Sequence, residues 1–218
     1  MENRIQKLIA IILGAGVAAS FAAAPPRPFS HKYHLTQVSA CENCHTEAVN
    51  STKASDNLLP AKEACVMCHD EVHIMEPRPA SGVQKFNHAH HVKMGSAAPL
   101  IAGAVKSGQY LGLEAPSPEV LANAKDACSG CHYGILASEN VPHDKPVKAH
   151  FPQMADCLTC HSKIQPPESC KQCHEESTPN FRPTSHTADF GDTHSQKTLA
   201  KTGCFTCHGR KFTCKGCH

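Results

Sequence analysis

The sequence predicts a mainly irregular chain with short α-helices and negligible β-sheet, packed around material other than its own side chains. Three observations support this: few large apolar residues, prolines that interrupt the chain, and a short motif that recurs seven times. The 218 residues include no Trp, 3 Tyr and 8 Phe, and 14 Cys contribute to the 40% hydrophobic fraction. So few large side chains cannot build an ordinary hydrophobic core at this length, which excludes an ordinary globular enzyme.

The charge of the chain is nearly balanced. There are 21 Lys and Arg against 19 Asp and Glu, and no long basic run occurs. Electrostatic capture of nucleic acid therefore has no support, and we expect no nucleic-acid partner.

The first residues have the layout of a secretory signal. The segment 1–7 carries Arg4 and Lys7, the run Leu8 to Ala24 is apolar, and small residues follow. Cleavage after Ala22 satisfies the small-residue rule, which makes 1–22 a signal peptide. An uncleaved membrane anchor is the alternative, because the apolar run reaches the lower end of the spanning length. Either reading predicts export to the periplasm or the cell exterior.

All the cysteines fall into seven Cys-x-x-Cys-His motifs, at 41–45, 65–69, 128–132, 157–161, 170–174, 204–208 and 214–218. A disulfide framework and zinc binding are the simpler readings of paired cysteines in an exported chain. Neither requires a His after every second Cys, whereas covalent attachment of c-type haem does.

Seven haem c groups, each with its iron, are therefore the expected cofactors, and their porphyrins are expected to form most of the core. Two thiols add to the vinyl groups of one porphyrin, and the adjacent imidazole binds the iron. The predicted attachment residues are Cys41, Cys44, Cys65, Cys68, Cys128, Cys131, Cys157, Cys160, Cys170, Cys173, Cys204, Cys207, Cys214 and Cys217. The predicted proximal ligands are His45, His69, His132, His161, His174, His208 and His218.

Ten further histidines are available to bind the opposite face of each iron. Seven are needed if every site is bis-histidine, and most of the ten stand ahead of haem motifs. Solvation is the simpler expectation for His73 and His90, which are poorly placed. The candidate distal ligands are His31, His34, His88, His91, His143, His150, His186 and His194.

Two short segments place pairs of histidines three residues apart. These are FSHKYH at 29–34 and FNHAHH at 86–91. On a helix, residues at i and i+3 share a face, so each pair can serve two different, adjacent irons. The sequence here resembles the class III multihaem cytochromes, of the cytochrome c3 and c7 type, through this Phe-x-His-x-x-His element ahead of Cys-x-x-Cys-His.

The resemblance implies that the first such His ligates the haem attached just downstream and that its neighbour serves another haem. Those small proteins carry three or four haems in one module, whereas here 36 residues, Val92 to Ala127, separate the second element from the next motif. The implied ligands are His31, His34, His88 and His91.

The motifs divide the chain into expected modules of two, three and two haems, at 23–80, 81–175 and 176–218. Secondary structure within them is expected to be sparse. Ser117 and Pro118 predict the start of a helix that runs into Cys128, and a second helix is expected over residues 60–64 ahead of Cys65.

The function expected is transfer of single electrons through closely spaced bis-histidine low-spin haems to redox partner proteins, rather than enzyme catalysis. Three alternatives stay open. The chain could polymerise into an extracellular haem filament. It could be an anchored subunit that takes electrons from a membrane quinol complex. It could also be a multihaem reductase, which would need one iron with an open face.

Overall fold

The computed structural model describes residues 29–72, 83–139, 151–161, 168–175, 186–193 and 201–208. The expected signal segment, 1–22, lies outside these residues. The described chain is mostly irregular with short helices and contains no strand element, apart from an isolated bridge at Phe29. This confirms the coarse fold class. None of the described helices combines the length and apolar character needed to cross a bilayer.

The helices are one to three turns long. The α-helices are α2 (His31–His34), α3 (Lys62–Val66), α4 (His88–Val92), α5 (Ala98–Lys106), α6 (Pro118–Asn123), α7 (Met154–Leu158), α8 (Phe190–Thr193) and α9 (Lys201–His208). The 3-10 helices are η1 (Cys41–Asn43), η2 (Thr46–Val49), η3 (Tyr133–Ala137) and η5 (Glu168–Gln172).

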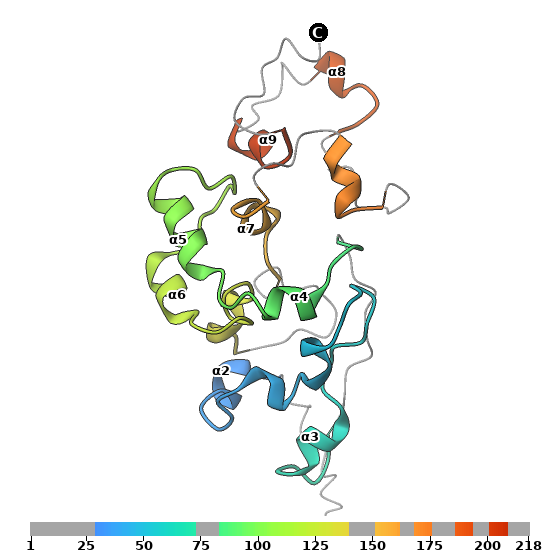
Figure 1. The fold of residues 1–218 in the computed structure, drawn as a ribbon, viewed down its shortest axis with the longest axis vertical. Helices are drawn as coiled ribbons and strands as arrows, with labels where there is room; N and C mark the ends of the chain where they lie inside the picture. Colours follow the sequence, from blue (N-terminus) through green and yellow to red (C-terminus); the bar gives the residue numbers. More distant parts are fainter. Residues whose placement is uncertain are drawn as a thin grey trace, which may run out of the picture.

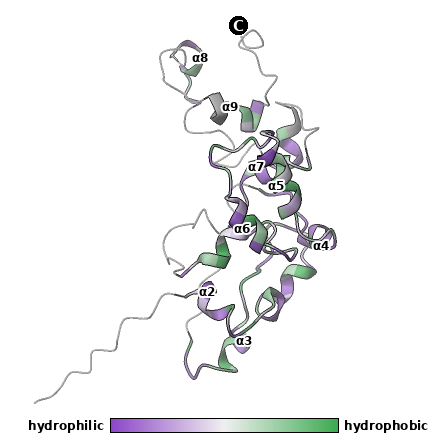
Figure 2. Ribbon diagram, turned by 90° about the vertical axis from the view of Figure 1, so that its left-hand side faces the viewer, coloured by the Kyte–Doolittle hydropathy of each residue, from purple (hydrophilic) through white to green (hydrophobic). Residues whose placement is uncertain are grey.

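The helices form an elongated array rather than a single layer. Figure 1 shows α3 near one end, α4 and α6 in the middle, and α8 and α9 at the other end. Within the array α2 packs against η3, α4 against η2, α5 against α6, and α7 against α9. Figure 2 shows short hydrophobic stretches spread along the length of the molecule.

The helix expected after Ser117 forms, but it is shorter than expected. The Ser117 side chain accepts a hydrogen bond from Val120 N at 3.3 Å, and Pro118 occupies the first turn, as predicted. The helix ends at Asn123 instead of running into Cys128. Ala124 leaves the helical conformation (φ −85°, ψ 71°), and its carbonyl oxygen accepts a hydrogen bond from Ser96 Oγ at 2.7 Å. A contact from a distant segment therefore ends this helix.

A small core of protein side chains lies mainly in the segment that separates the second histidine element from the third motif. Its buried members come from α5, α6 and the residues around them, together with Ala155 of α7, and Ile101 is completely inaccessible. The sequence shows these apolar residues but not their assembly. The buried hydrophobic residues are Ala98, Ile101, Tyr110, Leu121, Ala124 and Ala155.

A hydrogen-bonded carboxylate links this core to the fourth motif. Asp156, 5% exposed, accepts hydrogen bonds from Tyr110 Oη at 2.8 Å and from Tyr133 Oη at 3.1 Å. Gln153 N also donates to it, at 2.8 Å. Burial raises the pKa of Asp156, and burial together with this carboxylate raises the pKa of Tyr133 to about 12. The third and fourth motifs are thus fixed to one another through Asp156.

Candidate haem-binding sites

Helix α2 sets two imidazoles on one short turn. The Ser30 side chain caps it by accepting a hydrogen bond from Tyr33 N at 3.1 Å. The Phe29 ring then stacks on His34, with centroids 4.4 Å apart, and meets His31 edge-on at 4.9 Å. The aromatic residue at the start of the element therefore holds both histidine rings.

Each of these histidines faces the histidine of a different motif. The ring centroids of His31 and His45 are 6.3 Å apart, with the ring planes 16° from parallel. Those of His34 and His69 are 6.1 Å apart, at 42°. One helical turn therefore places two imidazoles opposite the histidines of the first and second motifs, because residues three apart share a helix face.

Helix α4 repeats the arrangement farther along the chain. The Asn87 side chain accepts from His90 N at 2.8 Å, and the Phe86 ring stacks on His91 at 4.3 Å. The His91 ring faces that of His161 in the fourth motif, with centroids 6.4 Å apart.

His88, the first residue of α4, lies beside the third motif. Burial lowers the pKa of His88, and the nearby charge of His132 lowers it further. His90, between the two candidate ligands, is exposed, in line with the solvation expected for it.

A further pair forms in the C-terminal part. The rings of His186 and His208 are 6.2 Å apart and 18° from parallel. Phe190 stacks on His186 at 4.4 Å, so a phenylalanine again supports the imidazole that stands outside the motif. Burial, and then the charge of His186, lower the pKa of His208.

The spacing of these pairs fits an iron atom between two imidazoles. An imidazole nitrogen binds a metal at about 2 Å, and the ring centre lies about 1.2 Å behind the nitrogen, so two ligands on one metal have centroids roughly 6.4 Å apart. The four measured separations run from 6.1 to 6.4 Å. Direct van der Waals stacking would bring the rings closer, to about 3.5–4 Å between carbon atoms. The two imidazoles of each pair are therefore spaced to fit one haem iron between them.

Hydrogen bonds fix which nitrogen is available for a metal. Three of the rings use Nδ1: His34 to Ser30 O at 2.7 Å, His45 to Leu58 O at 2.7 Å, and His91 to Asn87 O at 2.8 Å. A carbonyl oxygen only accepts, so each Nδ1 carries the proton. The Nε2 lone pair of each ring is then free to bind iron, and the hydrogen bond increases its basicity.

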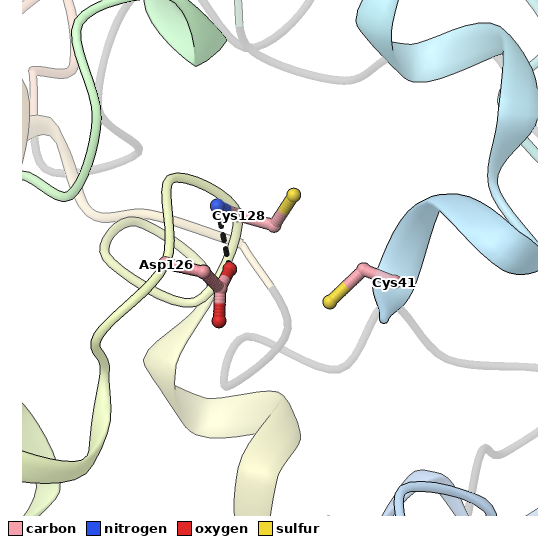
Figure 3. A group of neighbouring side chains, drawn as sticks. All are labelled: Cys41, Asp126 and Cys128. Carbon is pink, nitrogen blue, oxygen red and sulfur yellow. Dashed lines mark hydrogen bonds between the residues drawn. The ribbon is translucent and has the colours of Figure 1, made fainter. Parts of the chain in front are cut away.

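The twelve described motif cysteines are all free thiols, so no disulfide framework forms among them. Two of them, Cys41 and Cys128, come from different motifs, yet their sulfurs and a carboxylate oxygen of Asp126 lie within 4.8 Å of one another. Figure 3 shows Cys41 on its helix, facing the loop that carries the other two residues. The hydrogen bond from Cys128 lowers the pKa of the Cys41 thiol.

Asp126 shapes the start of the third motif. Its Oδ1 accepts from Cys128 N at 2.9 Å and Ser129 N at 2.8 Å, and its Oδ2 accepts from Ser129 Oγ at 2.6 Å. Burial raises the pKa of Asp126, but these hydrogen bonds outweigh it, and the net shift is downward. The carboxylate is therefore ionised at neutral pH.

The fifth motif is tied to the segment ahead of α4. Gln84 N and Lys85 N both donate to Cys173 O, each at 3.1 Å, and Lys85 Nζ donates to Lys171 O at 2.7 Å. The predicted site residues that lie outside the described part of the chain are His143, His150, His194, Cys214, Cys217 and His218.

The phenylalanines of the two histidine elements were part of the sequence pattern but had no predicted role. Asp126 was not predicted as a site residue. The signal for the phenylalanines was present, because Phe precedes His by two residues in both elements. No local signal identifies Asp126, since its importance comes from a thiol far away in the chain.

Comparisons with protein-family models, with curated proteins and with solved structures find no match.

Proposed function

We propose that this chain is an exported seven-haem c-type cytochrome that transfers single electrons through bis-histidine, low-spin haems. The observation that carries the proposal is the set of four imidazole pairs. Each joins a histidine of a Cys-x-x-Cys-His motif to one from elsewhere, at 6.1 to 6.4 Å between ring centroids.

The pairing supports electron transfer rather than catalysis at iron. Haem c supplies a reversible one-electron Fe(III)/Fe(II) couple when bound. Two imidazoles would hold each haem iron and would leave no position for a substrate. The Nδ1 hydrogen bonds of His34, His45 and His91 hold three of these rings in place. Rings held in this way would keep their positions in both oxidation states of the iron.

The pattern of pairing also supports the cytochrome c7-like assignment. His31 faces the motif histidine just downstream, and His34 faces the next one. On α4, His88 lies near the third motif and His91 faces the fourth. For both elements these placements support the ligand order that the resemblance implies.

Location and partners follow from the leader and the cofactor. The charged start and apolar run of residues 1–24 support export, and we propose that the protein is located in the periplasm or at the cell exterior. The partners proposed are other redox proteins that give or accept single electrons.

The proposal is tested by the haem content of the exported protein. Expression with a c-type haem maturation system should give a mass larger than the polypeptide by seven haem groups, bound stably in denaturant. Reductive titration should then take up seven electrons per chain. A chain exported and folded without haem, or one that holds zinc instead, would overturn the proposal.

A further inference from the structure

The first and third motifs meet although a complete motif separates them in the sequence. The sulfurs of Cys41 and Cys128 and a carboxylate oxygen of Asp126 lie within 4.8 Å of one another (Figure 3). Nearby, Lys32 N donates to Ser138 O at 2.9 Å, and Lys32 Nζ pairs with Glu139 at 2.6 Å. The contacts between the two motifs, and the separate contacts between α2 and the residues after η3, therefore hold these two parts of the chain together.

The second motif lies on the other side of the first. His69 of the second motif faces His34 of α2, and His31 of the same helix faces His45 of the first motif. Figures 1 and 2 both place α3, which carries Cys65, toward one end of the array. The second motif is thus next to the first and at an end.

The fourth motif lies beside the third, because Tyr133, next to the third motif, donates from Oη to Asp156, next to the fourth, at 3.1 Å. The fifth motif is tied to the segment ahead of α4, since Gln84 N and Lys85 N both donate to Cys173 O at 3.1 Å. His91 of α4 in turn faces His161 of the fourth motif.

The sixth motif lies next to the fourth. Helix α7, which carries Cys157 of the fourth motif, packs against α9, which carries Cys204 and Cys207 of the sixth.

We propose that the first motif, not the second, joins the N-terminal pair of motifs to the rest of the chain through Cys41, Asp126 and Cys128. This inference rests on the proposed function, because it gives the order in which the haems of that cytochrome are held. The order across the junction is 65–69, 41–45, 128–132 and 157–161.

Asp126 provides the test, because it touches both sides of the junction. The Asp126 carboxylate lies within 4.8 Å of the two sulfurs, of Cys41 and Cys128, that would hold the haems of the first and third motifs. A negative charge favours the more positive, oxidised state of any iron close to it. Asp126 therefore acts as a positioning residue that biases two haems at once.

The experiment compares Asp126→Asn with Asp189→Asn in the holoprotein. Asn keeps an oxygen that accepts from Cys128 N and Ser129 N, so the loop is retained. Asp189 is the control, since it also accepts from a hydroxyl, that of Thr193, and precedes α8 at the end of the molecule away from α3 (Figure 1). Reductive titration followed by NMR of the haem methyl groups gives a potential for each haem.

Asp126→Asn should shift the reduction equilibrium of two haems, those bound by His45 and His132, by about three- to tenfold toward the reduced form. The haem bound by His69 should not shift, and Asp189→Asn should shift none of the three. A change confined to the His132 haem would overturn the junction.

If Asp126→Asn does not fold, a crystal structure of the wild-type holoprotein decides. The iron bound by His45 should lie between those bound by His69 and His132. Direct contact between the His69 and His132 haems would refute the order. A preparation without haem would instead refute the proposed function and is recognised before titration.

Discussion

The imidazoles of His31 and His45 face each other almost in parallel, 6.3 Å apart between centroids. His31 belongs to α2, whereas His45 ends a Cys-x-x-Cys-His motif and lies between η1 and η2. Two rings at this distance are too far apart to stack, and their spacing fits one metal between them. Three other pairs among the described residues have nearly the same centroid spacing, and of these His186 and His208 are also close to parallel.

Removal of one distal imidazole should change one iron. In His91→Ala, the haem proposed at the fourth motif loses a ligand, and one high-spin haem should appear in the electron paramagnetic resonance spectrum. His90→Ala is the matched control, because its exposed ring is the neighbour of His91 on the same helix. Equal high-spin signals in the two variants would contradict the assignment of His91.

The phenylalanine ahead of each histidine element should stabilise the site. Phe86 stacks on His91 and meets His88 edge-on, at 4.3 and 4.6 Å between centroids. Phe86→Ala loses ring contacts and apolar area and should cost about 2 kcal/mol, whereas Phe86→Leu keeps most of the area and should cost about half as much. Thermal unfolding of the oxidised holoprotein measures the difference. Wild-type stability in both variants would show that the Phe86 ring does not stabilise the site.

Gly130, inside the third motif, should tolerate no side chain. An added Cβ would lie 2.7 Å from Ala97 N and 2.6 Å from Ser96 Oγ. Gly130→Ala should therefore cost about 1–3 kcal/mol through overpacking. In contrast, Gly103 in α5 has open space around it, and Gly103→Ala should be neutral or stabilising by up to about 1 kcal/mol. Denaturant unfolding of both variants checks this contrast, which fails if the two behave alike.

The buried carboxylate of Asp156 should affect how the free energy of unfolding depends on pH. Burial raises the pKa of Asp156 above its unfolded value of about 3.9, so between those two pKa values the folded chain binds more protons than the unfolded chain. Its contribution to the free energy of unfolding is therefore present at low pH and is lost as pH rises through the folded pKa.

Asp156→Asn should flatten that part of the stability profile. Asp56 has the opposite sign: hydrogen bonds, first from Ser51, lower its pKa, so its contribution is lost as pH falls. Unfolding measured across the acidic range should show opposite changes for the two Asn variants. Parallel changes would contradict the environment assigned to Asp156.

The local parts of the site could be predicted from the sequence. The spacing of three residues between His31 and His34 fixes a shared helix face, and Ser117 with Pro118 fixes a helix start. The prediction failed at the end of α6, because Ser96 binds the carbonyl of Ala124. Contacts within one turn are encoded locally, whereas this one depends on the folded arrangement.

The long-range parts of the site could not be predicted for the same reason. The contact of Cys41 with Cys128 and the bonds of Tyr110 and Tyr133 to Asp156 join residues with no periodic or motif relationship. The small core around Ile101 also depends on how α5 and α6 pack, which composition alone does not reveal.

The most direct test of the central claim is the ligand set of each iron in the oxidised holoprotein, read by magnetic circular dichroism together with electron paramagnetic resonance. Paired imidazoles predict that every iron is low-spin with two nitrogen ligands. Irons that are high-spin, or ligated by sulfur, at the motifs of His45, His69, His161 and His208 would contradict it.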